Sequence, residues 1–287
     1  MKNCKMKDVQ ELIIGFNMIQ LKQKIGDGFS SNLYLCDYEG KQCVIKIYKL
    51  NFSDKLRQKE IQILKSLDHP RILKIINHHP HYNYFICQQL KIDLFTIIKN
   101  GIQLEIRTVK QILLELSETI QYLHKLDYVH RDIKLENVML DNHFRIILID
   151  FGFADIVDNK KKYIRNCGTQ NYMSPELWIQ EKYIQSNLLK KCDIFALAVL
   201  IFILYYGFPP FSDISLKCPY WKIISEKKWN NFWKLANRNN KQNDILFQDL
   251  FEKMISPDPE NRYTIEQVLN HPWIDGNHDL SQLINII

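Results

Sequence analysis

The chain has 287 residues, of which 46% are hydrophobic and 24% are charged, and its formal net charge at pH 7 is +6. These proportions are typical of globular proteins and exclude a disordered or fibrous chain. The positive charge is spread along the sequence, whereas nucleic-acid-binding proteins concentrate basic residues in a patch, so no nucleic-acid partner is expected. This length predicts one large core or two lobes.

Cysteine spacing and the N-terminal residues indicate the compartment. The seven cysteines are far apart and form no Cys-x-x-Cys pair, so neither a disulfide framework nor a zinc site is predicted. The first fifteen residues are charged and lack a long apolar stretch, and Lys2 follows Met1 where myristoylation requires glycine. We therefore expect a cytoplasmic protein without a leader or lipid anchor.

One uncharged segment, residues 194–208, resembles a membrane span at first sight. Fifteen helical residues are too short for the ~30 Å hydrocarbon layer of a bilayer. Asp193 precedes the segment and Gly207 lies near its end, so we expect a buried central helix that begins at Asp193, and no membrane partner.

In chain order, strands are predicted at residues 18–25, 33–38, 42–48, 72–78 and 83–88, which are rich in β-branched and aromatic residues. A helix is predicted at 53–67, capped by Ser53, with one stripe formed by Leu56, Glu60, Leu64 and Leu67. From Leu104 the apolar residues follow a helical spacing. The predicted fold class is α+β: a small β-rich lobe with one main helix, then a larger mainly helical lobe. The pattern changes near residues 88–93, where a ligand could bind between the lobes.

Residues 25–33 (IGDGFSSNL) lie between two predicted strands, and their two glycines would let backbone amides approach phosphate oxygens. A simple hairpin turn would use the same residues, so the motif alone does not decide. Lys46, however, lies within an apolar strand, where an unpaired ammonium group is costly. We expect Glu60 to pair with Lys46 and leave its other side open to phosphate.

Residues 128–140 (YVHRDIKLENVML) place a histidine, an arginine, two carboxylates, a lysine and an asparagine between apolar flanks. Eighteen residues after Asp132 comes Asp150, in Leu-Ile-Asp-Phe-Gly, at the end of an apolar strand. Asp132, Asn137 and Asp150 could thus supply a base and two oxygen ligands for Mg²⁺.

At this point the chain resembles a eukaryotic protein kinase of the serine/threonine type over about residues 18–273. Further matches are Ser174-Pro175-Glu176 and the later Arg262, which resembles the arginine that pairs with that glutamate. The ending His-Pro-Trp at 271–273 and the Phe-Gly-Phe around Gly152 are most similar to the calcium/calmodulin-dependent, basophilic group.

The resemblance implies a bilobal kinase fold with an extension at 1–17, an N-lobe at about 18–89, a C-lobe at about 90–273 and a tail at 274–287. It also implies ATP and Mg²⁺ as cofactors and Ser/Thr of proteins as substrates. The implied catalytic residues are Asp132 as base, Lys134 on the transferred phosphoryl group, Lys46 on the α/β phosphates and its partner Glu60. Asn137 and Asp150 are the implied Mg²⁺ ligands.

The same resemblance implies a nucleotide site formed by Ile25, Gly26, Gly28, Leu33, Val44, Lys46, Gln88, Leu90, Asp93 and Met139. Glu136 and Asp93 are implied to favour basic residues before the target hydroxyl, and Thr169 with Lys134 is typical of serine/threonine specificity. We expect a monomer, with a regulatory protein binding through the tails. The alternative function is a catalytically silent scaffold with the kinase fold.

The sequence departs from the family in three respects. Ser31 replaces the third glycine of the loop and Val44 replaces the usual alanine, which tightens the pocket without removing charge. Residues 153–166 contain no Ser or Thr, and Tyr163 is their only hydroxyl, although Arg131, which normally binds the activating phosphate, is present. We therefore expect activity without phosphorylation, with Asp155 or Asp158 neutralising Arg131. The alternative is that Arg131 binds backbone carbonyls and the segment stays mobile until a partner or modification of Thr169 orders it.

Three remaining features are better explained by packing or solvation than by a functional site. Residues 78–81 (HHPH) are expected to form a solvated turn, because no further ligand supports a metal. Cys87 is expected to fill a small apolar space. Trp221, Trp229 and Trp233 are expected to share one helical face packed on the lobe.

Overall fold

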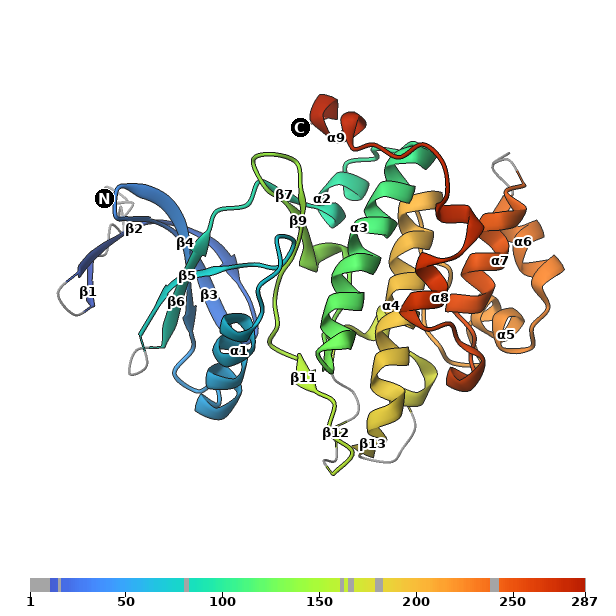
Figure 1. Ribbon diagram of the computed structural model, residues 1–287, viewed down its shortest axis with the longest axis horizontal. Coiled ribbons are helices and arrows are strands. Elements are labelled where there is room, and N and C mark those ends of the chain that lie inside the picture. The colour runs from blue at the N-terminus through green and yellow to red at the C-terminus, as the bar shows by residue number, and fades with distance from the viewer. Residues whose placement is uncertain are drawn as a thin grey trace, which may run out of the picture. The chain divides into compact units, whose positions relative to one another are not determined.

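The computed structural model describes residues 11–14, 17–79, 83–160, 163–164, 168–178, 183–237 and 243–286, and the chain divides into two compact units. Unit 1 comprises Met1–Asp68 and Ile72–Leu90, and unit 2 comprises His69–Arg71 and Lys91–Ile287. Unit 1 is a sheet with one helix and unit 2 is mainly helical (Figure 1). This composition confirms the predicted α+β class.

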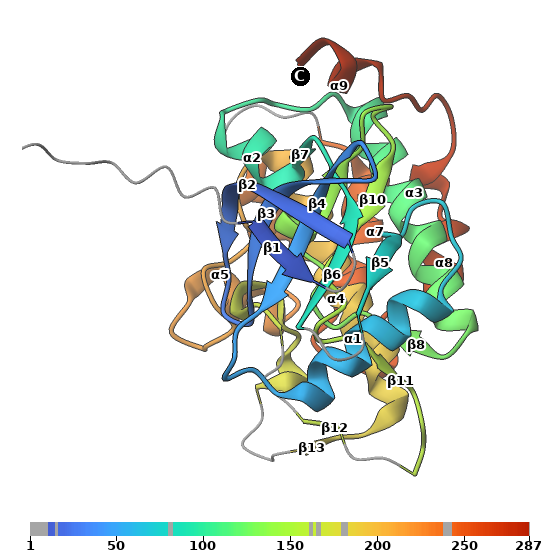
Figure 2. The ribbon, with the colours of Figure 1, turned by 90° about the vertical axis from the view of Figure 1, so that its left-hand side faces the viewer.

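The sheet of unit 1 has six strands in the order β1-β2-β3-β4-β6-β5, and all neighbours are antiparallel (Figure 2). Its strands are β1 (Glu11–Ile14), β2 (Asn17–Asp27), β3 (Ser31–Tyr38), β4 (Lys41–Tyr48), β5 (Ile75–His78) and β6 (Tyr84–Gln88). β1 lies within the segment that we expected as an extension at 1–17, and it adds an edge strand to this sheet.

The two faces of this sheet have different roles because side chains alternate along each strand. One face contributes a buried cluster that includes Ile19, Cys36, Tyr38, Cys43, Ile45, Tyr84 and Ile86. The neighbours Leu33, Val44 and Lys46 therefore point to the other face. Cys87, opposite Val44 in the register, is buried as expected.

Helix α1 (Asp54–Ser66) begins after Ser53, whose side chain makes no capping hydrogen bond, so the predicted cap was wrong in its chemistry. Glu60, Leu64 and Leu67 of the predicted stripe are buried, but the prediction was wrong for Leu56, which is 41% exposed. The buried residues of the helix are Arg57, Glu60, Ile61, Ile63 and Leu64, and four of them, at 57, 60, 61 and 64, have the i, i+3, i+4, i+7 spacing of one helical face. The first turn misled because Arg57 is buried there, whereas the neighbouring Leu56 faces outward.

The described part of unit 2 contains the remaining α-helices and seven short strands, which form four pairings because β9 has two neighbours. The helices are α2 (Leu94–Lys99), α3 (Ile106–Lys125), α4 (Ser186–Tyr206), α5 (Pro219–Ser225), α6 (Trp229–Ala236), α7 (Ile245–Met254), α8 (Ile265–Leu269) and α9 (Ser281–Ile286). The strands are β7 (Ile92–Asp93), β8 (Tyr128–Val129), β9 (Val138–Leu140), β10 (Ile146–Leu148), β11 (Asp155–Ile156), β12 (Tyr163–Ile164) and β13 (Tyr183–Ile184). β7 and β10 flank β9, while β8 pairs with β11 and β12 with β13.

Helix α4 is the buried central helix that the sequence predicted, and it lies against α3 (Figure 1). It begins at Ser186, seven residues before Asp193, so the predicted start was wrong. The first two turns carry Lys190 and Lys191, whose ammonium groups bind Asp127 and a backbone carbonyl, and this polar start hid the helix. Gly207 ends α4 in the left-handed conformation (φ 84°). None of the described helices is long and apolar enough to span a membrane.

The predicted tryptophan face was also wrong, because Trp221 lies in α5 whereas Trp229 and Trp233 lie in α6. Lys227, with a φ of 54°, interrupts the helical path between them. The packing role is nonetheless confirmed for Trp221 and Trp233, which are buried against phenylalanine rings of unit 2.

A buried ion pair joins two distant segments of unit 2. Arg262 is 1% exposed and binds Glu176 with two hydrogen bonds of 2.6 and 3.1 Å, as the sequence predicted. Burial alone would raise the pKa of Glu176, but the hydrogen bonds and charge of Arg262 outweigh it and lower that pKa. Arg262 also donates to the carbonyl oxygens of Lys191 and Ser256.

We predict that Arg262→Met lowers the free energy of unfolding by about 3 kcal/mol or more, because it leaves the buried Glu176 carboxylate without a cation. The matched control is Lys228→Met, which breaks an ion pair to Glu226 whose side chains are 58% and 38% exposed. That control should change stability by less than about 0.5 kcal/mol. Urea unfolding of both variants provides the measurement, and equal losses would contradict the prediction.

Candidate active site

In unit 1 the glycine-rich residues form the turn between β2 and β3, as the hairpin interpretation expected. The amide of Gly28 donates to the carbonyl of Ser31 at 2.9 Å, which closes the turn. Asp27 forms ion pairs with Lys24 at 2.7 Å and Lys49 at 3.0 Å. Hydrogen bonds from Lys24 and then Lys49 lower the pKa of Asp27 to about 2. The turn therefore keeps its acidic residue neutralised by two cations.

Space at Gly26 is limited by the following strand. A Cβ atom at Gly26 would lie 3.2 Å from Cδ1 of Leu33, so a larger residue would press on that side chain. Ile25, beside it, is 47% exposed, and Phe29 at the tip of the turn is 94% exposed. The turn thus presents backbone and apolar surface instead of charge at its tip.

Lys46 and Glu60 form the ion pair that the sequence predicted. The Nζ atom of Lys46 lies 2.6 Å from Oε1 of Glu60, and the two residues are 8% and 1% exposed. Tyr48 donates its hydroxyl to the other carboxylate oxygen, Oε2, at 2.8 Å. Tyr48 lies two residues after Lys46 on the same strand face, a signal that our sequence analysis missed.

The connecting residues contribute to each unit separately. In unit 1, Gln88 ends β6 opposite Cys43, and Leu90 follows it. In unit 2, Asp93 lies opposite Met139 in the β7–β9 pair. Both carboxylate oxygens of Asp93 bind Thr96, one accepting from its amide at 2.7 Å and one from its hydroxyl at 2.9 Å. Asp93 therefore caps α2, a role that the sequence analysis did not anticipate.

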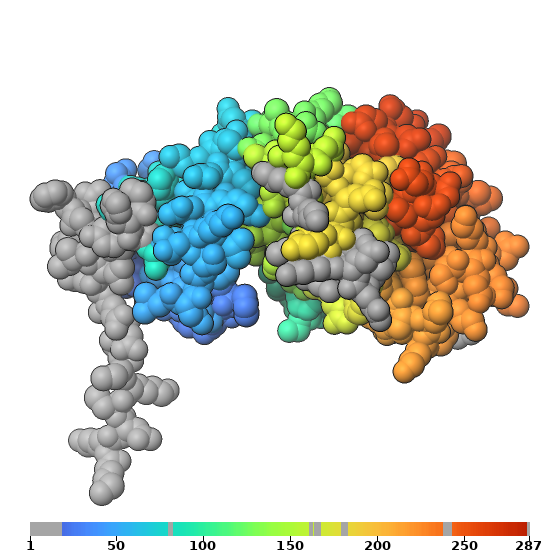
Figure 3. Space-filling view, turned by 90° about the horizontal axis from the view of Figure 1, so that it is seen from below, coloured from blue at the N-terminus to red at the C-terminus, as the bar shows by residue number. Residues whose placement is uncertain are grey.

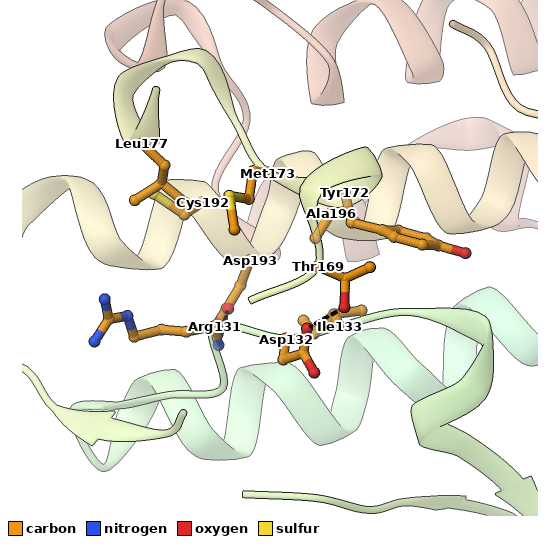
Figure 4. A pocket seen from close by; sticks show the side chains of 10 residues that line it. All are labelled: Arg131, Asp132, Ile133, Thr169, Tyr172, Met173, Leu177, Cys192, Asp193 and Ala196. Atoms are coloured by element: carbon orange, nitrogen blue, oxygen red, sulfur yellow. Dashed lines mark hydrogen bonds between the residues drawn. The ribbon is translucent and has the colours of Figure 1, made fainter. Parts of the chain in front are cut away.

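The catalytic-loop residues converge on the carboxylate of Asp132, which is 4% exposed. Its Oδ2 atom accepts from the side-chain amide of Asn137 at 2.9 Å and lies 2.8 Å from Nζ of Lys134. Its Oδ1 atom accepts from the hydroxyl of Thr169 at 2.9 Å (Figure 4). Lys134 donates to the same hydroxyl at 2.6 Å. One carboxylate thus organises a lysine, an amide and a hydroxyl.

Asn137 is oriented by a second hydrogen bond, from its side-chain nitrogen to the backbone carbonyl of Asp132 at 2.8 Å. Because the nitrogen is committed twice to Asp132, the side-chain oxygen is the atom suited to a cation. Asp150 follows β10 with a φ of 58°. Its neighbours are held in place: the carbonyl of Ile149 bonds the ring of His130 at 3.0 Å, and Phe151 is fully buried.

The backbone of the catalytic loop is anchored by Asp193 of α4. Its buried carboxylate accepts from the amides of His130 at 3.0 Å and Arg131 at 2.8 Å, and it pairs with the ring of His124 at 3.0 Å. Burial alone would raise the pKa of Asp193, but the hydrogen bond and charge of His124 lead the effects that lower it. Asp193 therefore stays ionised. Arg131 is held at a φ of 66°.

A small pocket lies beside Asp132, between the catalytic loop, the segment from Thr169 to Leu177, and α4 (Figure 4). Tyr172, Met173, Leu177, Cys192 and Ala196 supply most of its apolar lining. Gly168 fits here for steric reasons, because a Cβ atom would lie 2.5 Å from the carbonyl oxygen of Arg131 and φ is 103°. Glu136 is exposed on the same loop, and its charge contributes to the raised pKa of Tyr172, whose main cause is burial.

Within the described ranges, no group of three or more His, Cys, Asp and Glu residues is placed to hold a metal ion. His78 ends β5 and so belongs partly to a strand, contrary to the expected turn, and residues 80–81 lie outside the described part. Mg²⁺ is usually held by only one or two carboxylates together with phosphates. The oxygen donors of Asn137 and Asp150 fit that pattern.

Residues 19–274 match the model of the protein kinase domain. The chain belongs to the protein kinase family. It is 30% identical over 284 residues to "Meiosis-specific serine/threonine-protein kinase mek1" of Schizosaccharomyces pombe, with 90% of this chain and 59% of that protein covered. It is also 30% identical over 266 residues to "Probable cell cycle serine/threonine-protein kinase CDC5 homolog" of Encephalitozoon cuniculi, with 88% and 54% covered. The chain thus spans little more than half the length of these relatives.

Membership of the protein kinase family accounts for the two clusters described above. Kinases generally use ATP and Mg²⁺, and catalysis by them relies on positioning and charge stabilisation. The Lys46–Glu60 pair of unit 1 and the Asp132 network of unit 2 are arrangements of this kind. Tyr48, Thr96 and His124 add partners that sequence reasoning missed.

We predict that Asp193→Asn speeds hydrogen exchange at the amides of His130 and Arg131, because one oxygen that accepts from an amide becomes an NH₂ group. The loss of a charged acceptor should cost about 2 kcal/mol of local stability. Exchange read by mass spectrometry over residues 128–133 is the measurement. The control is Asp68→Asn, whose side chain is 92% exposed. Unchanged exchange at the loop in Asp193→Asn would contradict this prediction.

Proposed function

We propose that the chain is an active serine/threonine protein kinase that transfers the γ-phosphate of ATP to proteins. The observation that carries the proposal is the bonding of Asp132 to Lys134, Asn137 and Thr169 in one buried network. A base for a substrate hydroxyl must be held in position, and this network holds the carboxylate of Asp132 through three side chains. The names of the two relatives support the same reaction.

Each charged residue then has one task. Asp132 accepts the proton of the attacking hydroxyl, and Lys134 stabilises the phosphoryl group as it is transferred. The oxygen atoms of Asn137 and Asp150 would hold Mg²⁺, which neutralises phosphate charge when bound. Lys46, oriented by Glu60 and Tyr48, holds the α and β phosphates.

The nucleotide contacts are proposed from the family pattern. Backbone at Gly26 and Gly28 approaches the phosphates, and the backbone of Gln88 and Leu90 bonds the adenine edge. The apolar contacts to adenine come from Ile25, Leu33, Val44 and Met139. Asp93 would reach the ribose while it caps α2. Val44 is 9% exposed, which fits the tight pocket expected where a valine replaces the family's usual alanine.

The closer assignment is to the basophilic, calcium/calmodulin-dependent group, with Arg or Lys preferred shortly before the target residue. Glu136 supports this proposal because it is exposed on the catalytic loop, near Tyr172 of the pocket beside Asp132. Asp93 supports it less, since both of its oxygens already bind Thr96.

We also propose a cytoplasmic monomer regulated by a protein that binds the tails. At the C-terminal side, Gln282 bonds the amide of Glu105 at 2.7 Å and the carbonyl of Gln103 at 2.9 Å, and Asp279 pairs with Arg107. These contacts fix the segment after 274 to the start of α3. Residues 1–10 lie outside the described residues.

The alternative, a silent scaffold, rests on Ser31 in place of the loop glycine and on the absence of Ser and Thr from residues 153–166. Ser31 is buried and begins β3 in regular pairing with Tyr48, so it leaves the turn intact. Incubation with Mg²⁺-ATP and a basic peptide separates the two functions. Equal phosphate incorporation by the native chain and Asp132→Asn would favour the scaffold.

We predict that Lys46→Met lowers the rate of phosphoryl transfer by roughly 10³-fold or more while the fold persists, because the phosphates lose their cation. Lys41→Met is the matched control, since Lys41 is an exposed residue at the start of the same strand. Its rate should stay within about twofold of wild type, as expected for an exposed site. A Lys46→Met variant that keeps a tenth of the rate would show that another residue holds the phosphates.

We predict that a peptide screen selects Arg, then Lys, shortly before the phosphorylated residue, because Arg pairs with a carboxylate through two hydrogen bonds. Glu136→Gln should raise KM for the best Arg-containing peptide roughly tenfold, as expected for a lost charged contact. Glu266→Gln, on an exposed position of α8, is the control. Dominance of acidic residues or proline in the screen would refute the basic preference.

A further inference from the structure

The described part of the activation segment (residues 153–160, 163–164 and 168–176) is held by contacts within unit 2 and reaches its surface (Figure 3). β11 pairs with β8, the strand directly before His130, and the amide of Val157 donates to the carbonyl of Asp127 at 2.6 Å. Further on, Asn159 accepts from the hydroxyl of Ser186 at 2.6 Å, and β12 pairs with β13. The described part of the segment is thus attached at several points without a phosphate.

Tyr163 of β12 links these attachments. Its hydroxyl accepts from the amide of Asp158 at 2.5 Å and donates to the carbonyl of Ile156, although the residue is only 3% exposed. Burial, followed by smaller effects that include the charges of Asp155 and Asp158, raises the pKa of Tyr163. The hydroxyl therefore remains protonated near neutral pH, as a donor requires.

The ring of Tyr163 connects the segment to the pocket beside Asp132. It belongs to a buried cluster with Val129, Ile184, Leu189, Met173, Leu177 and Cys192. Met173, Leu177 and Cys192 also line that pocket (Figure 4). A change in the position of Tyr163 would therefore be transmitted through packed side chains to the wall of the site.

The same hydroxyl is the only one that residues 153–166 offer for phosphorylation. In this structure it is buried and already forms hydrogen bonds to the backbone of Ile156 and Asp158 within the segment. Figure 4 shows the side chain of Arg131 directed away from Asp132, and its charge lies close enough to Tyr163 to lower the pKa of that residue slightly against the larger effect of burial.

We propose that Tyr163 is a positioning residue that fixes the activation segment as a neutral internal tether, in the role that a phosphorylated residue has in other kinases. Its hydroxyl fixes residues 156–158, and its ring fixes the wall of the pocket beside Asp132. The kinase would then be active as synthesised. The kinetic part of this inference rests on the proposed kinase function, whereas the structural part does not.

The test uses the full chain expressed in bacteria, treated with phosphatase and shown by mass spectrometry to be unmodified over residues 153–176. Tyr163→Phe keeps the ring and removes only the hydroxyl. Tyr220→Phe, a 38% exposed position on α5, is the matched control. Each protein is measured by hydrogen exchange over residues 155–158 and by kcat and KM for ATP and peptide.

We expect exchange in Tyr163→Phe to rise roughly fivefold and kcat to fall by a similar factor, as loss of one hydrogen-bonding group predicts. KM for ATP should change less than twofold, and Tyr220→Phe should match wild type. Unchanged exchange would overturn the tether, and so would faster exchange with an unchanged kcat. Loss of wild-type activity on phosphatase treatment would also overturn it. If wild type transfers no phosphate at all, the proposed function fails, and the exchange result alone decides the tether.

Discussion

The carboxylate of Asp193 is the interaction on which the catalytic half of this molecule depends. A buried ion is stable only when its oxygens are satisfied, and here two backbone amides and a histidine ring supply the donors. Those amides belong to His130 and Arg131. The need of the buried carboxylate for hydrogen-bond donors therefore determines the path of the catalytic loop. Asp132, the next residue, is then presented to Lys134, Asn137 and Thr169.

The two units use the same physical device. In each, an ion is buried with a partner and a third hydrogen-bonding group, as in Lys46 with Glu60 and Tyr48, or Arg262 with Glu176 and the carbonyl of Ser256. Such pairs add little net stability compared with apolar residues, but breaking one partner is costly. Their effect is to hold specific side chains in specific positions, which phosphoryl transfer requires.

Much of the fold followed from periodicity, since the strands of unit 1 and the helices α3 and α4 have clear apolar patterns. The Lys46–Glu60 pair could be predicted because a lysine inside an apolar strand needs a carboxylate. Our predictions failed where polar residues are buried or hydrogen-bonded inside an element. In α1 the buried residue of the first turn is Arg57 and not the expected Leu56, and lysines hid the first turns of α4. Thr96 bonds Asp93 three residues before it, a local capping pattern that the sequence contains and that we overlooked. Tyr48 and Tyr163 bond partners 12 and five to seven residues away, outside the spacing of any regular element.

The apolar surface of α4 also has a consequence for synthesis of the chain. The helix ends at Tyr206, whereas much of what covers it comes later, including Phe232, Phe251 and Arg262. At roughly 5–20 residues per second, the ribosome needs several seconds to extend from Tyr206 to Arg262. During that interval α3 can already pack against α4, but the side of α4 that the later residues cover stays exposed. Exposed apolar surface of this kind favours aggregation and chaperone binding.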